Sequence, residues 1–449
     1  MKLTRPNWPL ILLILALAAA KYFYQALVIG PFEIDQEFLA SEAWNFLKLG
    51  KVSLIGAPTS SGNMYIGPFY TYFITLLMAM TKLNPHIINI VSAIWATITA
   101  ISLYFIGTKL FSREVGIIAG ILSAISISYL SLLNTPPLVV PLSLVSLLTF
   151  YTISQWGRNH HFFILSIILA AIALHLHFTG LYLSGFIIFW ALITKFKLTK
   201  SDFLQTALIL LFSLSPLIAF DLRHDFLNSR NFITFLLTTN SLQVILWSIG
   251  NSFNLALANL GALLNNFSSY NQLLGGLTLV AFSLYFVSRQ PRSTDHKLLL
   301  SWLIFPIILS GFYTGDLLPY YYIFHQASIF LITGLLLEGI IRSSIGCTGF
   351  TTIILLYTLL NFNYHHSLTT DFSLRNKLAA FEFIKHHAGN TNINLSFTLE
   401  HARRGGLDFL RNYYGFNADI KPDLPTYTLV TPHGFNQIKA DKTFGEIDI

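Results

Sequence analysis

Residues 8–29 read WPLILLILALAAAKYFYQALVI, and Lys21 is the one charged side chain in this run. A helix rises about 1.5 Å per residue, so a run of this length spans a hydrocarbon core about 30 Å thick. Lys2 and Arg5 precede the run, as in a signal peptide, but the run is too long and no small-residue cleavage site follows it. We therefore predict a retained membrane anchor.

Apolar runs of similar length recur along most of the chain. The 449 residues are 54% hydrophobic and 10% charged, a composition that one soluble core cannot bury. Period-2 alternation is absent, which predicts helices rather than a β-barrel. The predicted fold class is mainly α, a polytopic transmembrane bundle of about 11 helices. The predicted spans are residues 8–29, 86–108, 114–133, 138–156, 161–177, 179–194, 203–221, 271–288, 297–314, 319–340 and 346–362.

The basic residues between these runs predict the topology. By the positive-inside rule, one side of the membrane holds Lys2/Arg5, Lys109/Arg113, Arg158, Lys195/Lys197/Lys200, Arg289/Arg292/Lys297 and Arg342. We expect an integral protein of the cytoplasmic (plasma) membrane with a cytoplasmic N-terminus. Residues 30–85, 222–270 and 363–449 then lie outside. The formal net charge of +7 reflects this topology and does not indicate a nucleic-acid partner. The single cysteine, Cys347, excludes an internal disulfide framework.

Two apolar segments do not fit a simple count of spans. A spanning helix at 66–80 would move Lys109 and Arg113 outside, so we predict a juxtamembrane or re-entrant helix there, with a spanning helix as the alternative. Residues 241–266 mix apolar with polar side chains and are predicted to lie along the interface.

The chain divides into a transmembrane domain, residues 1–362, and a small soluble domain outside the membrane, residues 363–449. Apolar runs end at Phe362, and charged, Asn and Gly residues follow. The soluble domain is predicted to be α/β, with helices at 374–387 and 405–414 and strands at 392–399 and 426–431. A domain of this size gains stability by docking on the membrane domain.

The first outer loop, residues 30–85, is the most informative segment for function. Residues 33–73 read EIDQEFLASEAWNFLKLGKVSLIGAPTSSGNMYIGPFYTYF. The part from Asp35 to Leu49 is amphipathic, and Asp35, Glu37 and Glu42 lie near its start, where carboxylates favour the helix dipole. These acids are either helix-start charges in water or groups held at the depth of lipid head groups.

Several short motifs resemble those of the C-type membrane glycosyltransferases. The resemblance is to the branch of the protein O-mannosyltransferases and the aminoarabinose transferase of lipid A, in its uncharacterised prokaryotic members. It rests on Asp35-Gln36-Glu37, Leu54–Ser60 (LIGAPTS), Gly67-Pro68, Tyr70-Thr71-Tyr72, and Phe220–His224 (FDLRH) with Asn228. The membrane domain matches in order and topology, and the C-terminal domain matches only in placement.

The resemblance implies a transferase that moves a hexosyl or pentosyl unit from a polyprenyl-phosphate donor. The acceptor is a lipid, glycan or protein hydroxyl outside the membrane. Asp35 is the expected general base for direct, inverting displacement, because a phosphate leaving group needs no protonation. Glu37 departs from the aspartate or arginine of relatives and is left as acceptor ligand, tuning group or ligand of a divalent cation. Asp35 and Glu37 alone would make a weak metal site, so the cofactor is unknown.

The donor phosphate needs a cation on the outer side. The resemblance points to Arg223, whose planar guanidinium suits phosphate, with His224 beside it. The alternative is an arginine that snorkels or caps the helix. Arg230, Arg403 and Arg404 are further candidates. The substrate cavity is expected to be lined by Tyr65, Tyr70, His177, Tyr320, Tyr322 and His325.

Two other classes of function remain open. A transporter or flippase for a lipid-linked saccharide would require internal repeats and midplane charges, whereas no repeat is evident and the midplane charges are few. A noncatalytic membrane scaffold would leave Asp35 without a role. The expected partners are the polyprenyl-phosphate sugar, a lipid, glycan or protein acceptor, and membrane lipids.

Overall fold

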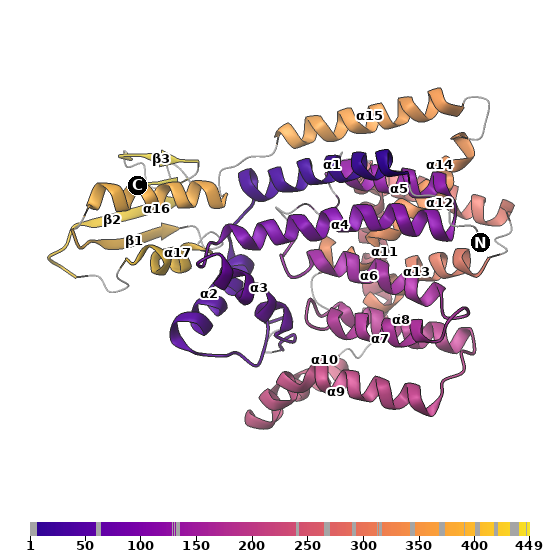
Figure 1. The fold of residues 1–449 in the computed structure, drawn as a ribbon, viewed down its shortest axis with the longest axis horizontal. Helices are drawn as coiled ribbons and strands as arrows, with labels where there is room; N and C mark the ends of the chain where they lie inside the picture. The colour runs from indigo at the N-terminus through magenta and orange to yellow at the C-terminus, as the bar shows by residue number, and fades with distance from the viewer. Residues whose placement is uncertain are drawn as a thin grey trace.

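The computed structural model covers the chain as one bundle of helices with a small α/β domain at one end (Figure 1). The end of the bundle that bears this domain is called the domain end. The residues that the structure describes are 7–59, 64–127, 129, 131, 135–238, 242–264, 270–289, 293–311, 313, 317–341, 346–367, 373–389, 391–399, 405–416, 421–431, 440–445 and 447–449.

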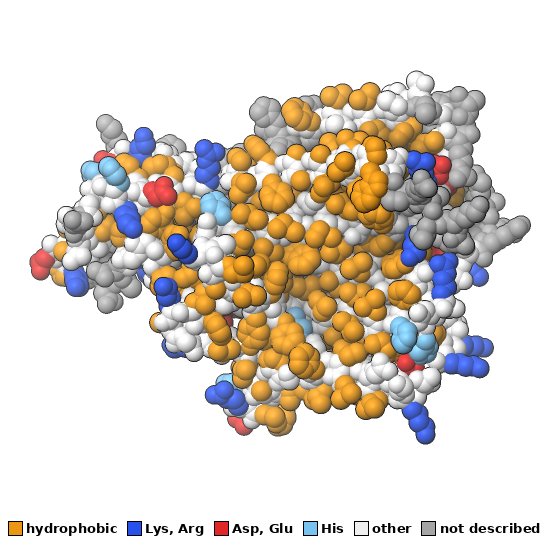
Figure 2. Space-filling view, viewed as in Figure 1, with side chains coloured by type: hydrophobic (Ala, Val, Ile, Leu, Met, Phe, Trp, Pro, Cys, Tyr) orange, Lys and Arg blue, Asp and Glu red, His pale blue; other side chains and the backbone are white. Residues whose placement is uncertain are grey.

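Each predicted span overlaps one α-helix of the bundle. The helices are α1 (Trp8–Tyr24) with a π-helical turn (Gln25–Ile29), α4 (His86–Leu110), α5 (Arg113–Ile125), α6 (Val140–Ser154), α7 (His161–Ala173), α8 (Gly180–Ile193), α9 (Lys200–Arg223), α12 (Asn271–Arg289), α13 (Thr294–Ser310), α14 (Ile323–Ile341) and α15 (Gly346–Ser367). Among the described residues, three helical segments are long and apolar enough to cross a membrane by themselves: Trp8–Ile29, His86–Leu110 and Lys200–Arg223. Hydrophobic side chains cover the middle of the bundle, and Lys and Arg gather toward its ends (Figure 2).

Small residues and satisfied backbone groups allow the central helices to pack closely. A Cβ on Gly107 of α4 would lie 2.8 Å from Cα of Gly116 of α5, so this pair sets the approach of the two helices. Lys21 Nζ donates to the carbonyl of Ser126, 2.6 Å away, at the C-terminal end of α5. Ile127 N donates to Asn361 Oδ1 at 2.7 Å. Side chains from α1 and α15 therefore bond the backbone of Ser126 and Ile127, just after α5.

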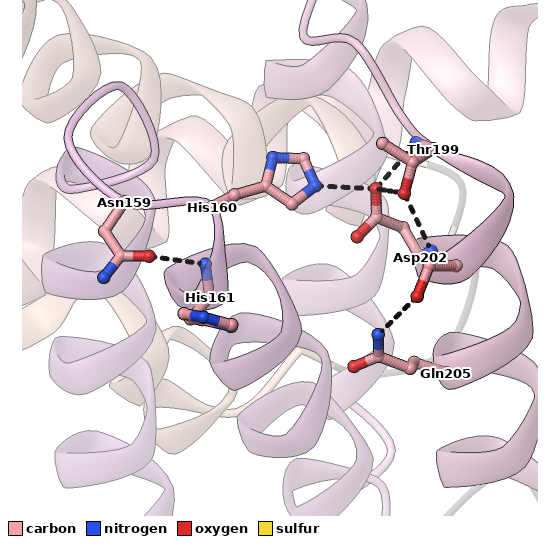
Figure 3. Close-up of polar contacts among 7 residues, drawn as sticks. Asn159, His160, His161, Thr199, Asp202 and Gln205 are labelled. Atoms are coloured by element: carbon pink, nitrogen blue, oxygen red, sulfur yellow. Dashed lines mark hydrogen bonds and ion pairs between the residues drawn. The ribbon is translucent and has the colours of Figure 1, made fainter.

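Helix α9 lies at the edge of the bundle, beside α7 (Figure 1). A capping box starts it, because Asp202 N donates to Thr199 Oγ1 and Thr199 N donates to Asp202 Oδ2. The same carboxylate bonds His160 Nε2 at 2.6 Å, just before α7 begins (Figure 3). This contact fastens the start of α9 to the start of α7, at the end of the bundle opposite the C-terminal domain.

The segment predicted to be the first outer loop, residues 30–85, contributes two helices at the domain end, α2 (Ile34–Leu49) and α3 (Phe69–Met80). Glu33 and Gln36 form a capping box at the start of α2, and Gly50 ends it with a left-handed φ of 66°. Helix α3 has 12 residues, so it is roughly 18 Å long and shorter than a hydrocarbon core. Helices α5 and α7 have only 13 residues each, so length does not separate a juxtamembrane α3 from a spanning one, and its juxtamembrane placement stays a prediction.

Two more helices, α10 (Leu227–Thr238) and α11 (Leu242–Leu264), follow α9. The segment predicted to lie along the interface is α11, and it packs antiparallel on α12: a Cβ on Gly275 of α12 would meet the Leu257 carbonyl oxygen at 2.0 Å. The helix is thus part of the bundle, and its placement at an interface stays a prediction.

The C-terminal domain has the predicted α/β composition. It contains α16 (Leu374–Ala388), β1 (Asn394–Leu399), α17 (Leu407–Tyr414), β2 (Thr426–Thr431), β3 (Thr443–Phe444) and β4 (Ile447–Asp448). The strand order is β1-β2-β4-β3; β1 and β2 are parallel with Asn394 opposite Thr426, and the other pairs are antiparallel. The two longer strands and both helices were predicted from the sequence, whereas the two-residue strands were not.

Candidate functional site

A cavity of about 680 Å³ lies at the domain end of the bundle. Its walls come from α2, the loop before α3, the turn between α7 and α8, α10, and the 3-10 turn Pro319–Tyr322 that precedes α14. Most of the lining is apolar. The charged group in the lining is the carboxylate of Asp35, among the residues that the structure describes.

Asp35 is in the first turn of α2 and faces this cavity. Burial raises the pKa of the Asp35 carboxyl, and the nearby charge of Glu33 raises it further. The helix dipole acts in the opposite direction, but burial dominates. A carboxylate with a raised pKa is a stronger base than an ordinary aspartate, which suits it to accept a proton.

Aromatic side chains form another wall of the cavity. His177 lies between Tyr320 and Tyr321, with ring centroids 5.7 and 5.3 Å away. Thr179 N donates to His177 Nδ1 at 3.2 Å, so Nε2 carries the proton of the neutral ring. The hydroxyl of Tyr320 is close enough to Asp35 for an electrostatic interaction. The cavity therefore presents a basic carboxylate, ring faces and hydroxyl groups together.

The structure does not bring Glu37 to the cavity. Its Oε1 accepts a hydrogen bond from Phe409 N at 2.8 Å, at the start of α17 in the C-terminal domain. Residues two apart on a helix point about 200° apart, so Asp35 and Glu37 diverge. Among the described residues, no three His, Cys, Asp or Glu side chains are grouped as metal ligands. Glu37 therefore does not supply a second ligand beside Asp35.

Arg223 and His224 also lie outside the cavity. Both are exposed at the end of α9, and His224 stacks on Phe220 at 4.2 Å and bonds its carbonyl through Nδ1 at 2.8 Å. Arg230 is exposed on α10. Arg403 and Arg404 fall outside the described residues. The described lining of the cavity has no Lys or Arg.

The FDLRH segment organises the loop beside the cavity instead. Asp221 caps α10 by accepting from Asn228 N at 2.7 Å and Ser229 Oγ at 2.5 Å. Asn228 then holds the backbone of Tyr65: Tyr65 N donates to its Oδ1 at 2.8 Å, and its Nδ2 donates to Tyr65 O at 3.2 Å. This contact fixes the loop that contributes Pro58 to the cavity, because Pro58 and Tyr65 form a β-bridge.

The predicted lining residues divide into three groups. His177 and Tyr320 line the cavity, and Tyr65 lines a smaller neighbouring cavity of about 270 Å³ that also includes His177. Tyr70 is buried and donates to Pro137 O at 3.2 Å, and it is not part of the described lining of either cavity. The side chain of His325 lies outside the described residues.

Tyr322 is fully buried and packs against Ala256 of α11 rather than lining the cavity. The reason is the 3-10 turn, in which successive side chains point about 120° apart, so consecutive tyrosines face different sides. Tyr321 takes the lining position. The sequence reasoning also missed Phe38, Tyr182 and Tyr313. Phe38 follows Asp35 by three residues and shares its helix face, a spacing that predicts its position.

Comparisons with known proteins agree with this architecture. Residues 66–220 match the family model described as dolichyl-phosphate-mannose-protein mannosyltransferase. No curated protein matches the chain. ArnT from Cupriavidus metallidurans, in its structure bound to undecaprenyl phosphate, matches with a TM-score of 0.61 at 10% identity, over 95% of this chain and 94% of its own.

The oligosaccharyltransferase AglB from Archaeoglobus fulgidus, in complex with an inhibitory peptide and a dolichol-phosphate, matches with a TM-score of 0.51 at 12% identity. That match covers 90% of this chain and 63% of AglB. At such identities, the structural likeness shows a shared fold.

Proposed function

We propose that the chain is a C-type membrane glycosyltransferase, which transfers a monosaccharide from a polyprenyl phosphate to a hydroxyl acceptor. The observation that carries the proposal is Asp35, a carboxylate with a raised pKa that faces a cavity of about 680 Å³. The proposed transfer is of a hexosyl or a pentosyl unit.

Asp35 acts as the general base in the proposed reaction. Its carboxylate takes the proton of the acceptor hydroxyl as the oxygen attacks the anomeric carbon from the face opposite the phosphate. The sugar–phosphate bond breaks, polyprenyl phosphate leaves, and the configuration inverts. One base suffices, because the departing phosphate is already a stable anion. The apolar walls exclude water, which would otherwise compete as acceptor.

The aromatic wall supports a sugar as the ligand. Tyr320, Tyr321 and His177 line the cavity, where aromatic rings would pack on the apolar side of a sugar and tyrosine hydroxyls would bond its hydroxyl groups. The donor lipid is proposed from the relatives, since ArnT is bound to undecaprenyl phosphate and AglB to a dolichol-phosphate. The acceptor is a lipid, a glycan or a protein.

The reaction is proposed to take place outside the membrane. The basic segment Lys195–Lys200 precedes α9 at the end of the bundle opposite the cavity. By the positive-inside rule that end is cytoplasmic, so the N-terminus is cytoplasmic and the cavity and C-terminal domain are outside. A divalent cation would find one carboxylate in the described lining, which is a weak donor set, and no step is assigned to it.

The test uses the purified full-length protein in lipid nanodiscs. Polyprenyl-phosphate hexoses and pentoses are supplied with lipid, glycan and peptide acceptors, and release of polyprenyl phosphate with formation of product is measured. We expect turnover with one donor class and its loss in Asp35→Asn. Translocation of a polyprenyl-phosphate sugar across the bilayer with no sugar transfer would overturn the proposal in favour of a flippase.

A further inference from the structure

The C-terminal domain holds the backbone segment that leads into Asp35. Leu374 N donates to Gly30 O at 2.9 Å, and Pro31 forms a β-bridge with Ser373. One residue further along, the carbonyl of Phe32 accepts from Lys377 Nζ at 2.7 Å. The start of α16 therefore runs along residues 30–32, immediately before the helix that carries the proposed base.

Lys377 is the centre of this junction. Its side chain is 2% exposed, and Nζ donates both to Phe32 O and to Gly405 O, the latter at 2.8 Å. A buried ammonium is costly unless hydrogen bonds and opposite charges compensate it. Here the two carbonyls and the nearby charges of Glu33 and Glu37 do so, while burial lowers the pKa of Lys377 to about 8.

The third segment of the junction is the Gly405-Gly406 turn before α17. A Cβ on Gly405 would lie 2.6 Å from Ile34 N, and one on Gly406 would lie 2.2 Å from Phe32 O. Backbone thus packs directly on backbone at the first residue of α2. Glu37 completes the contact by capping α17 through Phe409 N.

We propose that Lys377 is a positioning residue for transfer: its ammonium ties the carbonyls of Phe32 and Gly405 together and thereby fixes the orientation of Asp35 in the cavity. The inference rests on the proposed function. The C-terminal domain, which does not contribute to the described lining of the cavity, would thus orient the proposed base. Lys377 touches neither the cavity nor its lining carboxylate directly, so it acts through the backbone.

The test compares Lys377→Met, which keeps the length of the side chain but loses its donors, with Lys377→Arg, which keeps donors. Arg375→Met is the matched control, because Arg375 is an exposed cation two residues away on α16. All are studied as full-length protein in nanodiscs. We expect Lys377→Met to lower kcat at least tenfold while the Kd for polyprenyl phosphate changes less than twofold. Lys377→Arg should recover part of kcat, and Arg375→Met should match the wild type.

Two further measurements separate this proposal from the function on which it rests. In an Asp35→Asn background, Lys377→Met should produce no further loss, because both changes act on the same base. Hydrogen exchange of the amides of residues 30–37 needs no turnover, and it should become faster in Lys377→Met alone.

Unchanged exchange in these amides, or a folded Lys377→Met with kcat within twofold of wild type, would overturn the positioning role. Absence of transfer in the wild type would overturn the proposed function instead, and hydrogen exchange would still decide whether Lys377 fixes this segment.

Discussion

Replacing Asp35 by Asn tests the proposed base most directly. The change keeps the size of the side chain and removes its basicity, so transfer should fall by on the order of 10² to 10⁴, the usual contribution of a general base. Donor binding should survive, because the walls of the cavity are unchanged. The assay is turnover of the polyprenyl-phosphate sugar identified with the wild type, alongside a separate binding measurement.

The pKa of Asp35 also predicts the direction in which the transfer rate changes with pH. Burial raises the pKa of the Asp35 carboxyl above its ordinary range, so the rate should rise with pH through that raised pKa and lose this limb in Asp35→Asn. A carboxyl with a raised folded pKa contributes stability below its unfolded pKa and loses it as pH rises through the folded pKa. At neutral pH the ionised Asp35 thus costs stability, and Asp35→Asn should unfold no more readily than the wild type. Near-normal turnover in a folded Asp35→Asn would refute the assignment of the base.

Three other substitutions test the surroundings of the cavity. Asn228→Ala removes two hydrogen bonds to the Tyr65 backbone, each contributing about 1 kcal/mol, and should lower transfer roughly 5- to 30-fold; an unchanged rate would show that the loop holds without it. Arg223→Ala should change donor affinity less than threefold, since Arg223 lies outside the cavity; a larger loss in a binding assay would mean that α9 moves inward. Gly406→Ala should increase proteolysis at the domain junction, because its Cβ would meet Phe32 O at 2.2 Å. The control Gly415→Ala, also at positive φ but with open space, should not do so.

The length of the apolar runs predicted the helices of the bundle that lie in the proposed spans, whereas α10 was not predicted. The arrangement of the site depends more on helix geometry than on the motif. The resemblance grouped Asp35 with Glu37 by sequence adjacency, yet residues two apart on a helix face different ways, as the contact of Glu37 with Phe409 shows. The 3-10 turn separates Tyr321 from Tyr322 for the same reason. In both cases the backbone conformation, and not the residue type, determines which side chain reaches the cavity.

The junction with the C-terminal domain could not be predicted from the sequence. Phe32 and Lys377 are 345 residues apart, and no periodicity links them. A lysine in an amphipathic helix ordinarily faces solvent, and its burial follows only from the backbone carbonyls that the tertiary structure brings to it. The role of Arg223 at the donor phosphate stays a prediction, and the structure places its exposed side chain outside the cavity that Asp35 lines. The FDLRH motif gives the position of Arg223 along the chain, but the tertiary structure determines which residues line the cavity.

The charge of the cavity leads to a last prediction about the donor. In the described lining, Asp35 is the charged group, and it is negative, while the proposed donor carries a phosphate. Two like charges about 4 Å apart at an effective dielectric constant of about 20 repel by roughly 4 kcal/mol, and by less at greater distance. Polyprenyl phosphate should therefore bind more weakly as pH rises and Asp35 ionises, and by linkage the bound phosphate should raise the pKa of Asp35 further. Because a higher pKa means a stronger base, Asp35 would be more basic with the donor bound than without it. Binding of polyprenyl phosphate measured across the pH range should weaken with pH in the wild type and much less in Asp35→Asn, which should bind more tightly at neutral pH. An identical pH dependence in the two proteins would show that a cation near the phosphate already screens it from Asp35.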